Sequence, residues 1–172
     1  PSAADAANIL ADYVGGGIGN FVTMMNDYVA KLGCKDTKFV NAHGLDANPN
    51  GYTTANDLYK ITQHALKNAT FKEITSTLRY DVAPTEKYPQ TRYLHNTNKI
   101  MNAGYSDYYH KSVTGVKTGT TDKAGRCVIT TASQDGYNYM LIVMRAPQYD
   151  IDNDGVEENV AFTDSKKIYE WA

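Results

Sequence analysis

The chain has 172 residues, of which 42% are hydrophobic and 21% charged, and these values fit one globular domain. A formal net charge of -2 provides no basic surface for phosphates, which excludes nucleic acid as a partner. No apolar run reaches the roughly 18 residues that a membrane-spanning helix needs. Because the chain opens on Pro1 without a Met, we expect a processed or truncated N-terminus, so a missing export signal is uninformative.

The first half of the chain predicts helices. Residues 4–14 and 20–33 carry apolar residues at helical spacing, and Gly33 is a natural stop. The second segment has an apolar stripe that consists of Phe21, Met24, Met25, Tyr28 and Leu32. Met24 and Met25 of this stripe are interpreted as core.

A loop rich in Asn, Asp, Gly and Pro follows at 34–52. Thr54, with Asp57 three residues later, resembles a capping box and predicts the start of a third helix. A shorter helix is predicted over 70–78.

From residue 79 onward the pattern changes to that of strands. Residues 79–98 predict an irregular hairpin that Pro84 and Pro89 confine to an edge. Three strands are predicted at 112–119, 126–133 and 137–145, with Asp135 and Gly136 as the turn between the last two. Residues 162–172 predict a final helix capped by Thr163 or Asp164.

This order of elements indicates the α+β class: a helical part (1–78), then a hairpin, an antiparallel meander and a last helix (79–172), within one domain (1–172). The strand at 137–145 is apolar on both faces, which is typical of a sheet interior. We expect it to form one edge of the meander, with the strand of Lys117 at the other edge. We therefore expect it to associate with a second copy or with a companion N-terminal fragment, or else to leave the isolated chain poorly stable.

The residues most suggestive of chemistry are Lys117, Thr118, Gly119 and Thr120. Together they offer a fixed positive charge, two hydroxyls and an approachable backbone on one strand. Such a set suits an anionic ligand that lies along the strand. A bare Lys-Thr-Gly triplet is far more often an ordinary surface strand with a solvated lysine, so the surrounding sequence has to decide.

The surrounding sequence, "YYHKSVTGVKTGTTDKAGRCVITTAS", resembles the third motif of the penicillin-recognising serine enzymes, and most closely the low-molecular-mass D-alanyl-D-alanine carboxypeptidases. Other stretches are similar to further parts of that family, in the right order from Ser2 to about Trp171. They are "PSAADAANILADYVGG", "MNDYVAKLGCKDTKFVNAHGLD", "YTTANDLYKI", "NTNKIM" and "DSKKIYEWA".

The resemblance implies part of the β-lactamase/transpeptidase-like fold and a serine enzyme that trims the terminal D-alanine from peptidoglycan stem peptides through an acyl-enzyme. It implies β-lactams as ligands, no metal and no organic cofactor. It also implies an extracytoplasmic place in the bacterial cell envelope, membrane-associated in the full-length parent. The family's five-stranded sheet takes its first two strands from an N-terminal segment that this chain lacks.

The resemblance assigns roles to five residues. Ser2 would pass a proton to the departing D-alanine amine, and Lys117 would supply positive potential. Thr118 and Thr120 would hydrogen-bond the substrate carboxylate, and the Thr120 N–H would form half of the oxyanion hole. Gly119 would leave room for the substrate backbone. Along a regular strand, Lys117 and Gly119 point one way and the two threonines the other, so we expect strand twist at an edge to bring them into one groove near Ser2.

Two departures from the family pattern stand out. The nucleophile belongs to a Ser-x-x-Lys motif, and none of the six serines of this chain has a lysine three residues later. Ala4 stands where the family has the asparagine of Ser-x-Asn, an amide that helps to hold the substrate peptide. We therefore expect the chain alone to be inactive, either through truncation or through evolutionary loss of the serine.

Three alternatives remain open on the sequence. The chain could be a non-catalytic module that binds peptidoglycan or β-lactams, or it could belong to a β-lactamase or a transpeptidase of the same superfamily.

Other residues favour structural readings. Asp150, Asp152 and Asp154 match the opening of a calcium loop, but the twelfth position is Ala161 rather than Glu, which favours a solvated turn. Asp46 is explained by turn chemistry. The four histidines, His43, His64, His95 and His110, do not have the spacing of metal ligands. We expect His43 to hydrogen-bond the backbone and His64 to face solvent. Cys34 and Cys127 favour two buried free thiols over one disulfide.

Overall fold

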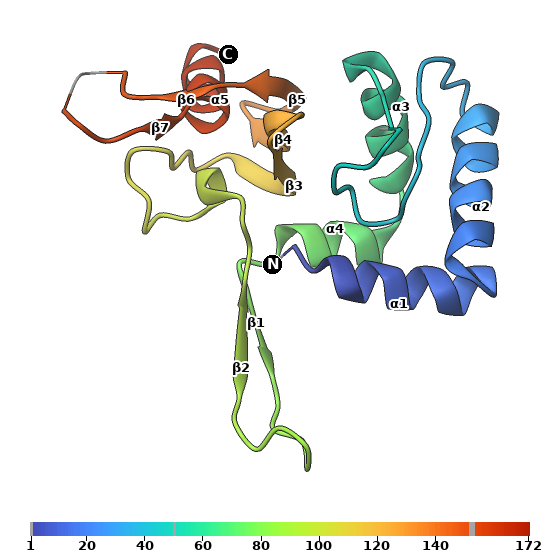
Figure 1. Ribbon diagram of the computed structural model, residues 1–172. Coiled ribbons are helices and arrows are strands. Elements are labelled where there is room, and N and C mark those ends of the chain that lie inside the picture. Colours follow the sequence, from blue (N-terminus) through green and yellow to red (C-terminus); the bar gives the residue numbers. More distant parts are fainter. Residues whose placement is uncertain (1, 50, 152–153) are drawn as a thin grey trace.

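The computed structural model describes residues 2–49, 51–151 and 154–172, and it runs from helices to strands to a last helix (Figure 1). The helices are α1 (Ala4–Gly15), α2 (Ile18–Lys31), α3 (Ala55–Ala65), α4 (Ala69–Ser76), the 3-10 turn η1 (Lys99–Met101) and α5 (Val160–Trp171). The strands are β1 (Arg79–Val82), β2 (Arg92–His95), β3 (Val113–Thr121), β4 (Gly125–Gln134), β5 (Tyr137–Ala146), β6 (Gln148–Tyr149) and β7 (Glu158–Asn159). The predicted α+β class is confirmed.

The three longest strands form the predicted antiparallel meander, in the order β3-β4-β5. The turn between β4 and β5 consists of Asp135 and Gly136, whose φ angles of 51° and 83° are those of a tight hairpin turn. The strand β3 ends at Thr121, two residues later than the predicted end at 119. The short pair of β6 and β7 was not predicted from the sequence.

The hydrophobic core lies between this sheet and α5. Val128 and Ala132 of β4 are buried against Ala161 and Tyr169 of α5. Thr130 lies between them on the same face, and its hydroxyl is 2.6 Å from the Tyr169 hydroxyl. Each buried hydroxyl thus has a partner, so the helix docks on the sheet without an unpaired polar group at this point.

The predicted cap of the final helix is wrong. The helix α5 begins at Val160, and the side chain of Asn159 accepts a hydrogen bond from the Ala161 N–H. The first turn carries Val160, Ala161 and Phe162, all of which are buried. Because this turn is buried, the helix begins three residues before Thr163, and Asn159 is then the residue in position to cap it.

The apolar stripe of α2 is more open than predicted. Val29 is buried, but Met24 is 48% exposed, so the assignment of Met24 to the core is wrong, and Met25 is only half-buried. Tyr28, on the same stripe, is 51% exposed. Helical periodicity identifies an apolar face but does not say which neighbour covers it. The Tyr28 hydroxyl lies 2.7 Å from Nε2 of His64, which is half-buried and does not simply face solvent as expected.

The hairpin of β1 and β2 projects from the body of the molecule (Figure 1). Its register pairs Arg79 with His95 and Val82 with Arg92, and Pro84 and Pro89 lie in the loop between the strands. The predicted irregular hairpin is therefore confirmed. No helix among the described residues has the length and apolar character needed to cross a bilayer.

Asp57 holds the helical part together near the start of α3. Its backbone N–H donates to the Thr54 side chain, which confirms the predicted cap. Its carboxylate accepts hydrogen bonds from the Asp36 N–H at 2.8 Å, the Thr37 hydroxyl at 2.9 Å and Lys60 Nζ at 3.2 Å. Burial alone would raise the pKa of Asp57, but these donors lower it below its ordinary value of 3.8.

We predict that Asp57 makes the stability of the isolated chain depend on acid pH. Because the folded pKa is depressed, its contribution is present above about pH 4 and is lost as the pH falls through the folded pKa. Asp57→Asn should lower the urea midpoint at pH 7 and flatten the change in midpoint between neutral and acid pH. Asp36→Asn, which changes an exposed neighbouring carboxylate, is the matched control. An Asp57→Asn variant as stable as the parent at pH 7 would contradict this role.

Candidate functional site

The candidate residues lie near the C-terminal end of β3, which forms one edge of the meander and points toward the helical part (Figure 1). In the register with β4, Lys117 lies opposite Ile129 and Gly119 lies opposite Cys127. Among the described strands β3 pairs with β4 alone. Its outer edge therefore leaves backbone N–H and C=O groups available to a ligand that binds as an extra strand.

Lys117 contacts Ser2, 115 residues earlier in the chain. Its Nζ donates to Ser2 Oγ at 3.0 Å and to the backbone oxygen of Thr118. Ser2 lies just before α1, which begins at Ala4, so the first helix places this hydroxyl at the sheet edge. The predicted proximity of Lys117 and Ser2 is confirmed, while their chemical roles stay predictions.

The Lys117 ammonium is partly desolvated. Lys117 is exposed at the sheet edge, yet its ammonium packs against Ser2 and Thr118, and this desolvation lowers the pKa of Lys117 below its ordinary 10.5. Within the described parts of the chain no carboxylate forms an ion pair with it. Its charge is therefore not neutralised locally, and it can attract an anion to the strand.

Thr118 turns toward a residue that the sequence did not single out. Its Oγ1 lies 2.6 Å from Oγ1 of Thr97, in the segment between β2 and η1. Thr120 is exposed on the same strand, opposite Arg126. The hydroxyls of Thr97 and Thr118 form a pair beside Lys117 that sequence spacing could not predict, because 21 residues separate them.

A cavity of about 530 Å³ begins at Lys117 and runs toward the base of the projecting hairpin. It is bounded by α4, by the hairpin, by the segment after β2 and by β3. Its lining residues are Thr70, Glu73, Ile74, Thr75, Thr77, Tyr80, Leu94, Asn96, Thr97, Val116 and Lys117.

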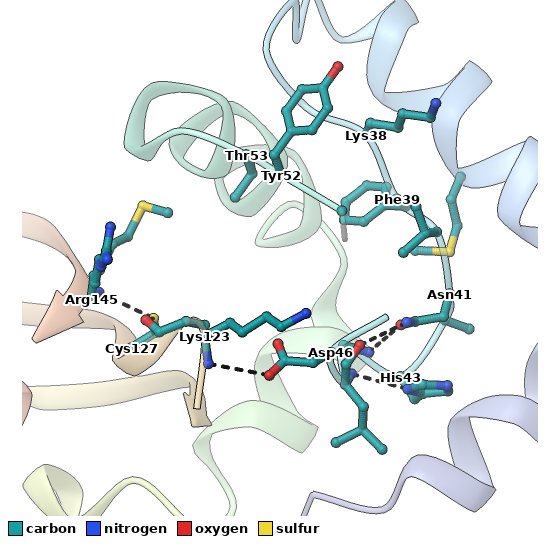
Figure 2. Close-up of a pocket in the computed structure, with 18 residues that line it drawn as sticks. Lys38, Phe39, Asn41, His43, Asp46, Tyr52, Thr53, Lys123, Cys127 and Arg145 are labelled. Carbon is teal, nitrogen blue, oxygen red and sulfur yellow. Dashed lines mark hydrogen bonds between the residues drawn. The ribbon is translucent and has the colours of Figure 1, made fainter. Parts of the chain in front are cut away.

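A second cavity, of about 680 Å³, lies between the loop after α2 and the sheet, and Figure 2 shows its lining. Asp46 closes one side of it: its carboxylate accepts a hydrogen bond from the Thr121 hydroxyl at 2.8 Å and from the Lys123 N–H at 3.3 Å. Local turn chemistry is therefore the wrong explanation for Asp46, because its partners lie more than seventy residues later. The loop is tied to the end of the strand that carries Lys117.

The remaining polar candidates have structural contacts. His43 Nδ1 accepts a hydrogen bond from the Leu45 N–H, as expected, and His110 Nδ1 lies 2.8 Å from the Ser112 hydroxyl. The side chain of Asp150 accepts hydrogen bonds from the N–H groups of Asp154 and Gly155. Asp152 lies outside the described residues. No group of three or more His, Cys, Asp and Glu side chains able to hold a metal occurs among the residues described.

The two thiols are not joined. Cys34 is buried, and Cys127 is only half-buried, so the expectation of free thiols is confirmed and that of burial holds for Cys34 alone. The backbone N–H of Arg145 donates to the sulfur of Cys127 at 3.5 Å.

Comparison with known proteins decides the family. A family model described as D-alanyl-D-alanine carboxypeptidase matches residues 1–148. The chain belongs to this family. The carboxypeptidase DacA of Haemophilus influenzae is 30% identical over 171 residues, which cover 97% of this chain and 37% of that protein. The chain thus spans little more than a third of this curated relative.

Solved structures of family proteins have the same fold. A penicillin-binding protein from Listeria monocytogenes in its ampicillin-bound form is 30% identical, with a TM-score of 0.75 over 98% of this chain and 61% of that one. A mutant of a Streptomyces DD-transpeptidase is 28% identical, with a TM-score of 0.79 over 99% of this chain and 63% of that one. The predicted membership of the β-lactamase/transpeptidase-like fold is confirmed.

We predict that Gly119 is not needed for the stability of this carboxypeptidase-family chain. A Cβ built at Gly119 would meet only the Cβ of Cys127, at 4.0 Å, which is ordinary contact. Gly119→Ala should therefore change the free energy of unfolding by no more than about 0.5 kcal/mol in urea titrations.

Gly125→Ala is the matched control. Gly125 has a φ of +67°, and a Cβ there would lie 3.1 Å from the Ala146 oxygen, so this variant should lose more than about 1 kcal/mol. If Gly119→Ala is as damaging as Gly125→Ala, the fold itself requires this glycine and the open space is not kept for a ligand.

Proposed function

We propose that this chain is part of a serine D-alanyl-D-alanine carboxypeptidase that removes the terminal D-alanine from peptidoglycan stem peptides through an acyl-enzyme. The observation that carries the proposal is the 3.0 Å contact between Lys117 Nζ and Ser2 Oγ at the open edge of β3, in a chain whose residues 1–148 match the carboxypeptidase family. A cation, a hydroxyl and a free strand edge are what a peptide with a terminal carboxylate requires.

In this proposal Ser2 and Lys117 are the catalytic pair of the chain. The Ser2 hydroxyl acts as a relay: it gives its proton to the departing D-alanine amine and takes up the proton that the attacking serine releases. Lys117 donates to the Ser2 oxygen and so leaves the Ser2 proton free to move. The positive charge of the partly desolvated Lys117 ammonium also stabilises negative charge on the Ser2 oxygen while the proton is transferred.

In this proposal β3 binds the substrate. The hydroxyls of Thr118 and Thr120 bind the carboxylate, and the Thr120 N–H forms half of the oxyanion hole. Gly119 leaves open space beside the strand, which a substrate backbone would occupy. Ala4 provides no amide at the place where the family has asparagine, so substrate binding depends more heavily on the β3 edge.

The nucleophile would come from outside this chain. None of its six serines is followed by a lysine at the third position, and the chain covers 37% of the DacA relative. A companion segment with Ser-x-x-Lys would complete the site, in an envelope protein that acts outside the cytoplasm. The ampicillin-bound form of the Listeria relative supports β-lactams as ligands.

A transpeptidase is the second candidate. The similarity to the Streptomyces DD-transpeptidase supports it, since that protein shares the fold over 99% of this chain. The two activities share the acyl-enzyme and differ in whether water or an amine attacks it. A non-catalytic binding module is the third candidate, which the absence of Ser-x-x-Lys from the chain supports.

The decisive experiment compares the chain with the longer protein that contains it. Mass spectrometry should detect a penicilloyl adduct on the longer protein and none on the 172-residue chain. In the longer protein, Ser2→Ala and Lys117→Ala should each lower the rate of D-alanine release by about 10²-fold or more. Lys111→Ala, which removes an exposed lysine before β3, should leave the rate unchanged.

Each outcome separates the candidates. An adduct on the isolated chain would contradict the missing nucleophile, and a longer protein that binds penicillin without an adduct would indicate a binding module. Release of D-alanine only when an amine acceptor is added would favour the transpeptidase.

We also propose that the outer edge of β5 is an association surface. Among the described strands β5 pairs with β4 alone, although it is ten residues long and carries Tyr139, Leu141 and Val143 packed against the core. An uncovered apolar edge strand is a template for pairing, so a second copy or the companion segment should cover it.

Light scattering on the isolated chain should therefore show dimers at high concentration, with the outward amides of 137–145 protected from hydrogen exchange. A well-folded monomer whose outward β5 amides exchange freely would show the idea to be wrong.

A further inference from the structure

Thr97 lies between two asparagines that are fixed by other parts of the fold. Asn98 is fully buried, and its Nδ2 donates to the backbone oxygen of Gly115 on β3 at 3.0 Å. Its Oδ1 accepts a hydrogen bond from the N–H of Ile100 at the start of η1. The residue after Thr97 is thus anchored to the strand that carries Lys117.

Asn96 anchors the other side. Its Nδ2 donates to the backbone oxygens of Thr75 and Thr77, at the end of α4, both at 3.1 Å. Its Oδ1 accepts a hydrogen bond from the N–H of Asn98 at 3.0 Å. Two amide side chains therefore hold the backbone of Thr97 between a helix end and the sheet, and they fix where its hydroxyl points.

The Thr97 hydroxyl reaches Thr118 at an oxygen–oxygen distance of 2.6 Å, a strong hydroxyl–hydroxyl hydrogen bond. Each hydroxyl has one proton, so only one of the two donates in this bond. When Thr97 donates, the Thr118 proton is free for another acceptor. When Thr118 donates, its proton is used inside the protein and only its lone pairs face a ligand.

We propose that Thr97 is a positioning residue for Thr118: it donates to Thr118 Oγ1, so that the Thr118 proton points to the carboxylate of a D-alanyl-D-alanine peptide. The inference rests on the function proposed above. Of the residues that line the 530 Å³ cavity, Lys117 is the only cation and Glu73 the only acid, so an anionic group is drawn toward Lys117, in a cavity that Thr97 also lines.

The test uses the longer protein, with an N-acylated tripeptide ending in D-Ala-D-Ala as substrate. Thr97→Val and Thr97→Ala should raise KM by roughly 5- to 10-fold with little change in kcat, because a hydrogen bond to a charged carboxylate is weakened before and during the reaction. Thr97→Ser keeps the donor and should stay within about 2-fold of the parent. Melting temperatures of all variants report on folding.

A double variant separates positioning from direct or structural effects. If Thr97 acts through Thr118, Thr97→Val/Thr118→Val should be no weaker than Thr118→Val alone. The matched control is Thr114→Val, which breaks another hydroxyl pair on β3, that of Thr114 and Thr131 at 3.0 Å. It should leave KM unchanged.

An unchanged KM in Thr97→Val, or additive effects in the double variant, would overturn the positioning role while the carboxypeptidase function stands. If the parent releases no D-alanine, the proposed function fails. The dissociation constant of ampicillin is then measured in place of KM, and each variant is expected to change it by the same factor relative to the parent. A parent that neither releases D-alanine nor binds ampicillin would overturn both.

Discussion

A lysine on the edge strand of the sheet reaches the hydroxyl of a serine at the start of the first helix, and the rest of the site depends on that contact. Lys117 and Ser2 are 115 residues apart in the chain, and Lys117 Nζ lies 3.0 Å from Ser2 Oγ. The contact requires α1 to begin beside β3, and it leaves a partly desolvated ammonium that has no carboxylate partner among the described residues. The helical part and the sheet are thus joined at the point where a ligand would bind.

Three long-range hydrogen bonds keep this junction in place. Asp46 fastens the loop after α2 to the end of β3, and Asn98 fastens the segment before η1 to Gly115, near the start of β3. The pair of Thr130 and Tyr169 fixes α5 on the far face of the sheet. All of these are hydrogen bonds between residues distant in sequence, so the geometry of the β3 edge is set by the tertiary fold and not by local turns.

The sequence predicted those parts of the structure whose cause is local. The Asp135–Gly136 turn, the Thr54 cap and the strand of Lys117 follow from turn chemistry, capping and strand propensity over a few residues. The cap of α5 was missed because burial of its first turn, a tertiary effect, decides where that helix begins.

The exposure of Met24 and Tyr28 on α2 could not be predicted either. Helical periodicity locates an apolar face, but it does not show whether another element packs against that face. At the site, the family motif located Lys117 and Ser2. Thr97 and the long-range role of Asp46 could not be read from the sequence, since each depends on a partner that only folding brings near. Motif spacing thus identifies the candidate site residues, and the tertiary contacts identify the partners around them.

The contact between Ser2 and Lys117 can be measured directly on the isolated chain by NMR. We expect a nuclear Overhauser cross-peak between the β-protons of Ser2 and the ε-protons of Lys117, since the attached oxygen and nitrogen are 3.0 Å apart. Absence of that cross-peak in a folded sample, with Lys117 resonances like those of a free lysine side chain, would contradict it.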